Sequence, residues 1–117
     1  MSQKMKQPDL FLKDGEAAAV DGMQRAVDHA DDVEALWSTK AFGSLMAYAW
    51  AQTQPFLIED ARLWAHRHDG LPLPPDGRAW GAVVRKAARS RFIKRVGTGN
   101  AQSSNNSPKC LWVARHD

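Results

Sequence analysis

The chain has 117 residues, of which 44% are hydrophobic and 25% charged, and its net charge is +3. This length allows one domain, or two at most, around a modest core. No apolar run approaches the roughly 18 residues that a membrane span needs, and the N-terminus lacks the apolar segment of a signal peptide. A single cysteine, Cys110, excludes an internal disulfide. We therefore expect a cytoplasmic protein without a membrane anchor or cofactor.

The charges are distributed unevenly along the chain. Residues 1–54 contain five Lys or Arg against eight Asp or Glu, whereas residues 55–117 contain eleven against five. Between Asp76 and His116, nine basic residues are accompanied by Asp76 alone. Such asymmetry is typical of a protein that binds a polyanion on its basic side, although a merely solvated surface has the same composition.

The first helix is predicted after a flexible tail. Residues 1–13 have no clear periodicity and contain one apolar cluster, Leu10-Phe11-Leu12. Asp14 is a suitable N-cap for a helix that extends to about Ala30. The apolar residues of this helix recur at steps of three and four: Val20, Met23, Val27 and Ala30. This spacing gives one apolar stripe, with charged residues on the other faces.

A second helix is predicted to restart at Asp31-Asp32, where negative charge favours a helix N-terminus. The stretch Val33–Gln52 is apolar around most of its circumference, which indicates a buried central helix. Pro55 ends it. We assign residues 14–52 to an N-terminal helical segment that packs on the core.

Residues 53–115 follow a different order. Phe56-Leu57-Ile58 is too short for more than a strand with one neighbour, and Glu59–His68 reads as a helix that stops at Asp69-Gly70. After a proline-rich turn, Asp76 is a suitable N-cap for a helix over residues 76–91. Two strands, 92–96 and 110–113, enclose the polar loop 97–108. The order helix, strand, helix, helix, hairpin is that of a winged helix.

The helix over residues 76–91 carries the strongest functional signal. At about 100° per residue, one side of it is apolar: Trp80, Val83, Val84 and Ala87. The opposite side is basic: Arg78, Arg85 and Arg89. A helix of this size fits the DNA major groove, where arginines bond guanine edges or phosphates. It also follows a tight turn from another helix, as the reading helix of a helix-turn-helix does.

Further basic residues surround this helix, and we expect them to contact phosphates: Lys86, Arg91, Lys94, Arg95 and Lys109. The segment 97–109 would be the wing, which positions a protein on DNA without reading bases. Plainer explanations stand beside these. A basic stripe is often only a solvated helix face, and residues 97–108 hold no Lys or Arg.

No other chemistry stands out in the sequence. His66 and His68 are two residues apart, so a helix directs them to different faces and they cannot chelate one metal together. Cys110 reads as a small buried residue. All five tryptophans are expected in the core: Trp37, Trp50, Trp64, Trp80 and Trp112. We predict neither a metal site nor an enzyme.

Several stretches together resemble a group of small winged-helix proteins found in phage and prophage gene clusters. They are Phe56-Leu-Ile-Glu-Asp-Ala-Arg62, Pro72-Leu-Pro-Pro-Asp76, Arg78-Ala-Trp-Gly81 with Val84, Ala87 and Ala88, the hairpin from Ile93 to Trp112, and Asp21-Gly-Met with Asp28-His-Ala30. They span about residues 15–113. The resemblance implies a winged-helix fold and a role on DNA in phage replication or regulation. The group often has Gly near the end of the reading helix, where this chain has Ser90-Arg91-Phe92.

We therefore expect a mainly α fold with a small β-hairpin (α+β), a winged helix-turn-helix with an extra N-terminal helix. The expected function is DNA binding, with duplex favoured, in phage or prophage replication or transcription regulation. The alternative is a protein-interaction adaptor, similar to a helicase loader or an anti-host factor, that uses the winged helix as a docking surface. Its working parts would be the N-terminal helix and Leu10-Phe11-Leu12, and the same helix could join two copies as a homodimer. Deleting residues 1–30 would separate these alternatives.

Overall fold

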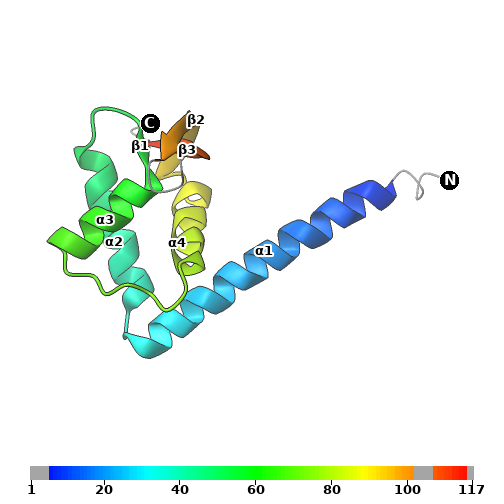
Figure 1. Cartoon of the computed structure of the whole chain (residues 1–117), viewed down its shortest axis with the longest axis horizontal. Helices are drawn as coiled ribbons and strands as arrows, with labels where there is room; N and C mark the ends of the chain where they lie inside the picture. The colour runs from blue at the N-terminus through cyan, green and yellow to red at the C-terminus, as the bar shows by residue number, and fades with distance from the viewer. Residues whose placement is uncertain (1–5, 102–106, 116–117) are drawn as a thin grey trace.

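The computed structural model describes the backbone of residues 6–101 and 107–115, and the side chains of residues 17–99 and 109–115. In these ranges the chain forms four helices and a three-stranded antiparallel sheet, which agrees with the predicted α+β class (Figure 1). The elements in chain order are α1 (Lys6–Val33), α2 (Trp37–Ala51), β1 (Phe56–Leu57), α3 (Ile58–His68), α4 (Arg78–Arg89), β2 (Ile93–Ala101) and β3 (Ser107–Ala114).

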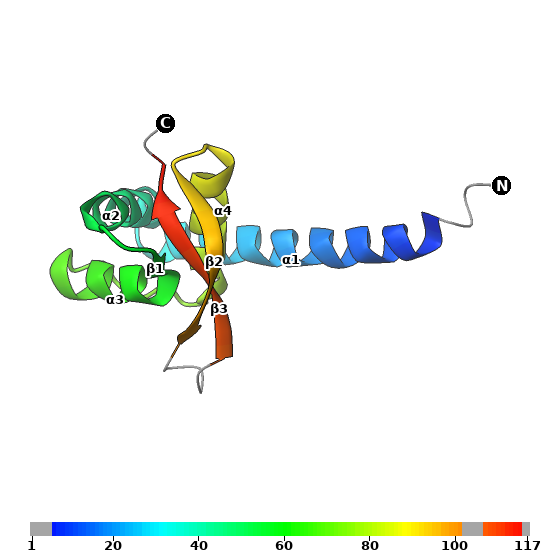
Figure 2. The same ribbon diagram turned by 90° about the horizontal axis from the view of Figure 1, so that it is seen from above.

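The sheet has the strand order β1-β3-β2, so the last strand lies in the middle. Within the sheet β1 pairs only with β3, with Phe56 opposite Trp112, which confirms the short strand predicted at this position. The predicted hairpin is also confirmed, but its strands extend well into the stretch expected to be a loop, from Ile93 opposite Ala114 to Ala101 opposite Ser107. The tip of the expected wing, residues 102–106, lies outside the described residues. Figure 2 shows the hairpin projecting beyond the helices.

The core lies where α2, α3, α4 and the sheet meet. The rings of Trp37 and Trp80, both almost fully buried, stand nearly perpendicular with their centres 5.5 Å apart. Such an edge-to-face pair adds stability beyond the area that it buries. Many of the other buried residues are alanines: Ala41, Ala49, Ala61, Ala65, Ala79 and Ala87. Small side chains let the helices approach closely, and Leu45 and Ile93 fill the remaining volume.

α1 is one helix of 28 residues, and its C-terminal half packs on the body while its N-terminal half projects away (Figures 1 and 2). The predicted apolar stripe is confirmed, since Val27 and Ala30 are buried and Val20 and Met23 half-buried. The helix begins at Lys6, so the predicted start at Asp14 is wrong and residues 6–13 belong to α1 rather than to a tail. Leu10-Phe11-Leu12 lies within this helix, where side chains are outside the described set.

The second helix begins at Trp37 and not at Asp31-Asp32, because Asp31 belongs to the end of α1 and caps α2 from there. Its Oδ1 accepts a hydrogen bond from the backbone N–H of Ser38 at 2.7 Å, and its Oδ2 accepts one from the Ser38 hydroxyl at 2.8 Å. The chain reverses through Leu36, whose φ of 63° is left-handed. Asp31 does favour the N-terminus of the second helix, as predicted, but it reaches that N-terminus from the end of α1 and is not the first residue of α2.

α2 is less fully buried than the sequence predicts. Its inward side consists of Trp37, Ala41, Ser44, Leu45 and Ala49. Trp50 is 54% exposed, so its assignment to the core is wrong. Trp64 and Trp112 are half-buried. α2 packs against α1, α3, α4 and β3, yet the side that carries Trp50 stays exposed, so the hydrophobicity of the segment overstates its burial.

The connection from α3 to α4 is anchored to α2. The predicted stop after α3 is confirmed, with Gly70 in a left-handed conformation at φ 65°. The Asp69 carboxylate accepts a hydrogen bond from the Ser44 hydroxyl. The indole Nε1 of Trp37 donates a hydrogen bond to the carbonyl oxygen of Pro72 at 2.8 Å. These two bonds attach both ends of the stretch 69–72 to α2.

Candidate nucleic-acid interface

α4 has one buried and one exposed side, as the sequence predicts. Trp80, Val83 and Ala87 are at most 3% exposed and face the core. Arg85 and Arg89 lie one helical turn apart on the exposed side. No ion pair among the described residues includes either of them. The helix therefore presents two adjacent guanidinium groups to solvent.

Arg78 does not extend this pair, because Asp76 holds it at the start of α4. α4 spans Arg78–Arg89 rather than residues 76–91, and its N-cap is Gly77, so the predicted N-cap at Asp76 is wrong by one residue. Asp76 Oδ1 accepts the backbone N–H of Arg78 at 2.9 Å, and Oδ2 accepts Nη2 of the same guanidinium at 2.7 Å. The hydrogen bonds from Arg78 lower the pKa of the Asp76 carboxyl below its ordinary value, and those to Asp76 raise the pKa of Arg78. The predicted row of three arginines thus consists of two exposed groups and one that is already paired.

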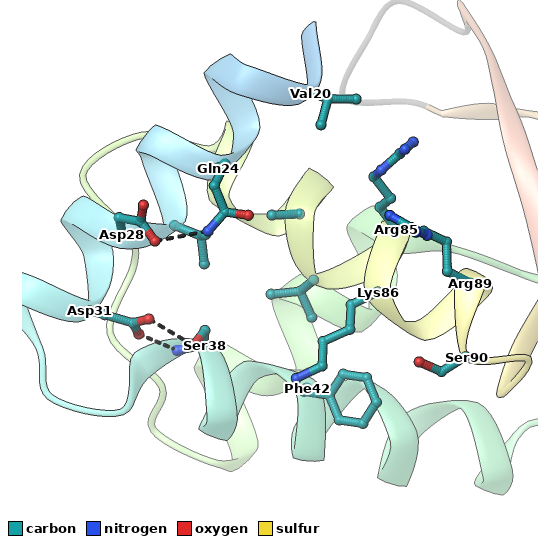
Figure 3. Close-up of a pocket in the computed structure, with 13 residues that line it drawn as sticks. Val20, Gln24, Asp28, Asp31, Ser38, Phe42, Arg85, Lys86, Arg89 and Ser90 are labelled. Atoms are coloured by element: carbon teal, nitrogen blue, oxygen red, sulfur yellow. Dashed lines mark hydrogen bonds between the residues drawn. The ribbon is translucent and has the colours of Figure 1, made fainter. Parts of the chain in front are cut away.

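Lys86 points away from the two arginines, toward α2 (Figure 3). Its Nζ lies 5.2 Å from the centre of the Phe42 ring, which is a cation–π contact. The side chain thereby links α4 to α2. Its position favours a structural role alongside the predicted phosphate contact.

A groove of about 580 Å³ separates α1 from the exposed side of α4 (Figure 3). Two acidic residues of α1 line it, opposite the basic residues of α4. Both are hydrogen-bonded elsewhere: Asp28 accepts from the side-chain amide of Gln24 at 2.9 Å, and Asp31 accepts from Ser38. The acidic N-terminal segment thus approaches Arg85 and Arg89 without neutralising them.

α1 crosses the first turns of α4 at a pair of glycines. A Cβ on Gly22 of α1 would lie 2.9 Å from Nη1 of Arg78, and a Cβ on Gly81 of α4 would lie 2.5 Å from Sδ of Met23. A side chain at either glycine would force the end of the Arg78 or the Met23 side chain to move. α1 therefore packs against the N-terminal part of α4, where the Arg78 side chain stays 65% exposed, and the C-terminal part carries Arg85 and Arg89.

The hairpin divides the remaining predicted residues between its two faces. Arg95 stands opposite Trp112, so both side chains lie on the face toward α4. Lys94 stands opposite Val113 on the other face, where it lines a hollow beside the end of α2. Arg91 is exposed in the turn after α4, with φ 64°.

A second groove lies between α3, α4 and β3, and we call it the hairpin groove. It has a volume of about 540 Å³. Its floor is apolar and is formed by Ile58, Val84, Ala88 and Trp112. Its rim is basic and is formed by Arg62, Arg85 and Arg89. An adjoining hollow of about 330 Å³ shares Ile58, Arg62 and Trp112 and adds Lys109. Arg85 and Arg89 line both the hairpin groove and the groove beside α1, so they form the ridge between these two grooves.

Arg62 and Trp112 were not predicted as binding residues. The sequence predicts Trp112 in the core and gives Arg62 no role beyond its place in the stretch that carries the resemblance. Both line the hairpin groove because β1, which pairs with β3 at Trp112, leads directly into α3. No periodicity in the sequence encodes this arrangement, since it depends on the strand order of the sheet.

Other chemistry has little support in the described part of the chain. No group of three or more His, Cys, Asp or Glu is arranged there to hold a metal ion. Nδ1 of His66 donates a hydrogen bond to the carbonyl oxygen of Leu71 at 2.9 Å, so that ring is engaged in structure. Cys110 is half-buried within β3, opposite Thr98, so it is less buried than the sequence predicts. Across the described helices, none combines the length and the apolar character that a bilayer crossing requires.

Comparison of the chain with models of known protein families, with curated proteins and with solved structures finds no match in any of the three. Function is therefore inferred from the geometry and charge of these surfaces.

Proposed function

We propose that the chain is a winged-helix protein that binds DNA through α4 and the hairpin. The order α2, β1, α3, α4, β2, β3 supports this fold, with α4 as the reading helix and the hairpin as the wing. The resemblance to phage and prophage proteins extends the proposal to replication or transcription regulation in the cytoplasm.

The observation that carries the proposal is the pair Arg85 and Arg89. They lie one turn apart on the exposed side of α4, and neither belongs to an ion pair among the described residues. Arg95 on β2 and Lys109 on β3 are exposed and add positive charge on the hairpin. Guanidinium groups bind phosphate in a bidentate manner, and such contacts dominate the affinity of proteins for DNA.

The packing of α1 against the first turns of α4 changes the expected mode of binding. In helix-turn-helix proteins, the N-terminal residues of the reading helix contact base edges in the major groove. Here Arg78 is paired with Asp76, and Gly22 of α1 lies next to it. Contacts to phosphates, and not to bases, are therefore the main source of affinity, which predicts weak sequence preference and strong salt dependence.

The test is the affinity of the chain for a labelled duplex of random sequence, measured by fluorescence anisotropy at several salt concentrations. We expect Arg85→Ala/Arg89→Ala to weaken binding by about tenfold or more and to reduce the slope of log K against log salt by about two units. The matched control is Arg25→Ala/Arg67→Ala, which removes the same charge from exposed positions on α1 and α3. A folded Arg85→Ala/Arg89→Ala variant that binds as tightly as the wild type would show that the proposal is wrong.

A second candidate function is favoured by one observation. The N-terminal half of α1 projects from the body (Figure 1), and a projecting helix is suited to a protein partner or a second copy. In such an adaptor, the basic side of α4 would contribute little to activity. A variant that lacks residues 1–16 distinguishes the two, because it removes part of the projecting helix and keeps Arg85 and Arg89.

A further inference from the structure

The hairpin groove combines an aromatic floor with a basic rim. The half-buried indole of Trp112 lines both the groove and the adjoining hollow, so it lies where the two meet. Phe56 and Arg95 flank it on the neighbouring strands. The indole of Trp112 therefore offers an apolar surface in a depression formed by the hairpin groove on one side of it and the adjoining hollow on the other.

The rim supplies cations at close quarters. Arg62 lies on α3, with Nη2 3.3 Å from where a Cβ of Gly77 would be, which places its guanidinium at the start of α4. Arg85 and Arg89 lie along the α4 side, and Lys109 lines the adjoining hollow. Glu59 is the one carboxylate among the described residues that line the two, and it lines only the hollow. The groove is therefore strongly positive around an apolar floor.

We infer that the hairpin groove binds a single-stranded segment of nucleic acid, with an unstacked base on Trp112 and the flanking phosphates on Arg62, Arg85 and Arg89. This inference rests on the DNA-binding function proposed above and names the form of DNA that this part of the surface selects. Single-strand binding sites combine a positive groove along the backbone with aromatic side chains on which bases stack. Both components are present here within one depression.

Duplex DNA cannot place a base on the apolar floor of the hairpin groove. In a duplex each base is covered on both faces, so no base is available to enter a depression and lie on an indole. Duplex DNA would contact the ridge at Arg85 and Arg89 and leave Trp112 uncovered. The groove thus favours a strand that is already separated, as at a fork, a bubble or an end.

An acidic peptide also has negative charge and apolar groups, but the rim favours phosphate. Three of its four cations are arginines. The planar guanidinium matches the geometry of phosphate oxygens. The groove is also continuous with the exposed pair Arg85 and Arg89, the surface assigned to DNA phosphates. We therefore commit to nucleic acid, and the peptide is an outcome of the test.

The experiment compares the binding of the full chain to a labelled thymidine oligonucleotide of about 12 residues and to a duplex of the same length. Trp112→Leu keeps an apolar residue on the strand but removes the stacking surface. We expect it to weaken binding of the single strand by about five- to a hundredfold and to leave duplex binding within about twofold. Trp112→Phe should retain most of the affinity. Trp50→Leu, which changes an exposed tryptophan outside the groove, is the matched control and should alter neither.

A second variant keeps the test decisive if Trp112→Leu does not fold. Arg62→Gln removes a rim charge that α3 contributes to the hairpin groove and that is not part of the exposed pair on α4. We expect it to weaken binding of the single strand by about tenfold and to change duplex binding by less than about twofold. An equal loss for both forms of DNA, with either variant, would overturn the inference.

The remaining outcomes separate this inference from the proposed function. If the wild type binds duplex through Arg85 and Arg89 but does not bind the single strand, the inference fails and the proposed function stands. If it binds neither, both fail. If a poly-glutamate peptide displaces the single strand and Trp112→Leu weakens binding of that peptide equally, the groove is a peptide site and the inference is wrong.

Discussion

Met23 on α1 lies directly over Gly81 on α4, so that a Cβ on Gly81 would be 2.5 Å from Met23 Sδ and 3.2 Å from Cγ. This contact fixes the crossing of the two helices. It also decides how α4 is presented, because the turn that carries Gly81 lies under α1 while the next turns carry Arg85 and Arg89. A side chain at position 81 must therefore displace Met23 or separate the helices.

Alanine substitutions at two helical glycines test this contact. Gly43 in α2 has nothing within 4 Å of its Cβ position, so Gly43→Ala should stabilise the protein by about 1 kcal/mol through helix propensity. Gly81→Ala gains the same propensity but forces Met23 to move, and we expect it to be less stable than Gly43→Ala by about 1–2 kcal/mol. Urea unfolding measures both.

A double-mutant cycle identifies the cause of this difference. In a Met23→Ala background the obstruction is gone, so Gly81→Ala should be about 1 kcal/mol more favourable than in the wild type. Equal effects of Gly81→Ala in the two backgrounds would mean that Met23 does not press on position 81, and that the helices cross differently.

The pairing of Asp76 with Arg78 predicts a specific pH dependence. The hydrogen bonds from Arg78 lower the pKa of the folded Asp76 carboxyl below its ordinary value of 3.8. As pH falls below about 4, the unfolded chain takes up this proton first, so the stabilisation is complete above that pH and is lost as the folded carboxyl is protonated. The pKa of Asp76, measured by NMR, should lie below 3.8 in the wild type and return toward it in Arg78→Ala.

Asp76→Asn provides the control for this prediction, because asparagine keeps a side-chain oxygen that accepts the backbone N–H of Arg78 and removes the charge. Its stability should fall short of the wild type at neutral pH and approach the wild type as the solution is acidified through the pKa of Asp76. A stability difference that is constant with pH would contradict the assignment of the charge effect to this pair.

The elements that the sequence predicted best are those encoded by local periodicity. The two sides of α4 follow from residues within three turns, since Trp80 and Val83 recur with the helical repeat and Arg85 falls on the opposite side. The single-ladder strand at Phe56 and the stop at Gly70 follow from length and turn chemistry.

The features that the sequence did not predict depend on contacts between distant segments. Gly22 gives no local signal that it lies against Arg78, and Asp31 gives none that it caps the following helix. Lys94 and Arg95 are neighbours in sequence, yet the sheet puts them on opposite faces of the hairpin, one beside α2 and one beside Trp112. Trp50 has the composition of a core residue but lies on the side of α2 that nothing described covers fully.

The hydrogen bond from Trp37 to Pro72 predicts a measurable contribution to stability. Trp37→Phe retains an aromatic ring in the core but leaves the Pro72 carbonyl without its donor, which should cost about 1–3 kcal/mol in urea unfolding. Trp64→Phe is the control, because the structure gives Trp64 ring contacts to Tyr48 and His68 but no hydrogen bond of this kind. A loss for Trp37→Phe no larger than that for Trp64→Phe would mean that the bond does not anchor the connection before α4.

Truncation of α1 tests which part of it folds the protein and which part serves a partner. Deleting residues 1–30, the experiment that the sequence suggests, removes Ala26, Val27 and Ala30 from the core. We expect that variant to lose its cooperative unfolding transition, so it cannot report on function.

Deleting residues 1–16 removes only the projecting part of α1 and should leave the unfolding transition in place (Figure 2). If the chain acts through DNA, this shorter deletion retains duplex affinity within about twofold of the wild type, because Arg85, Arg89 and the hairpin remain. If it is an adaptor, the same deletion abolishes its association with a partner or with a second copy, as measured by analytical ultracentrifugation, while DNA affinity is negligible before and after.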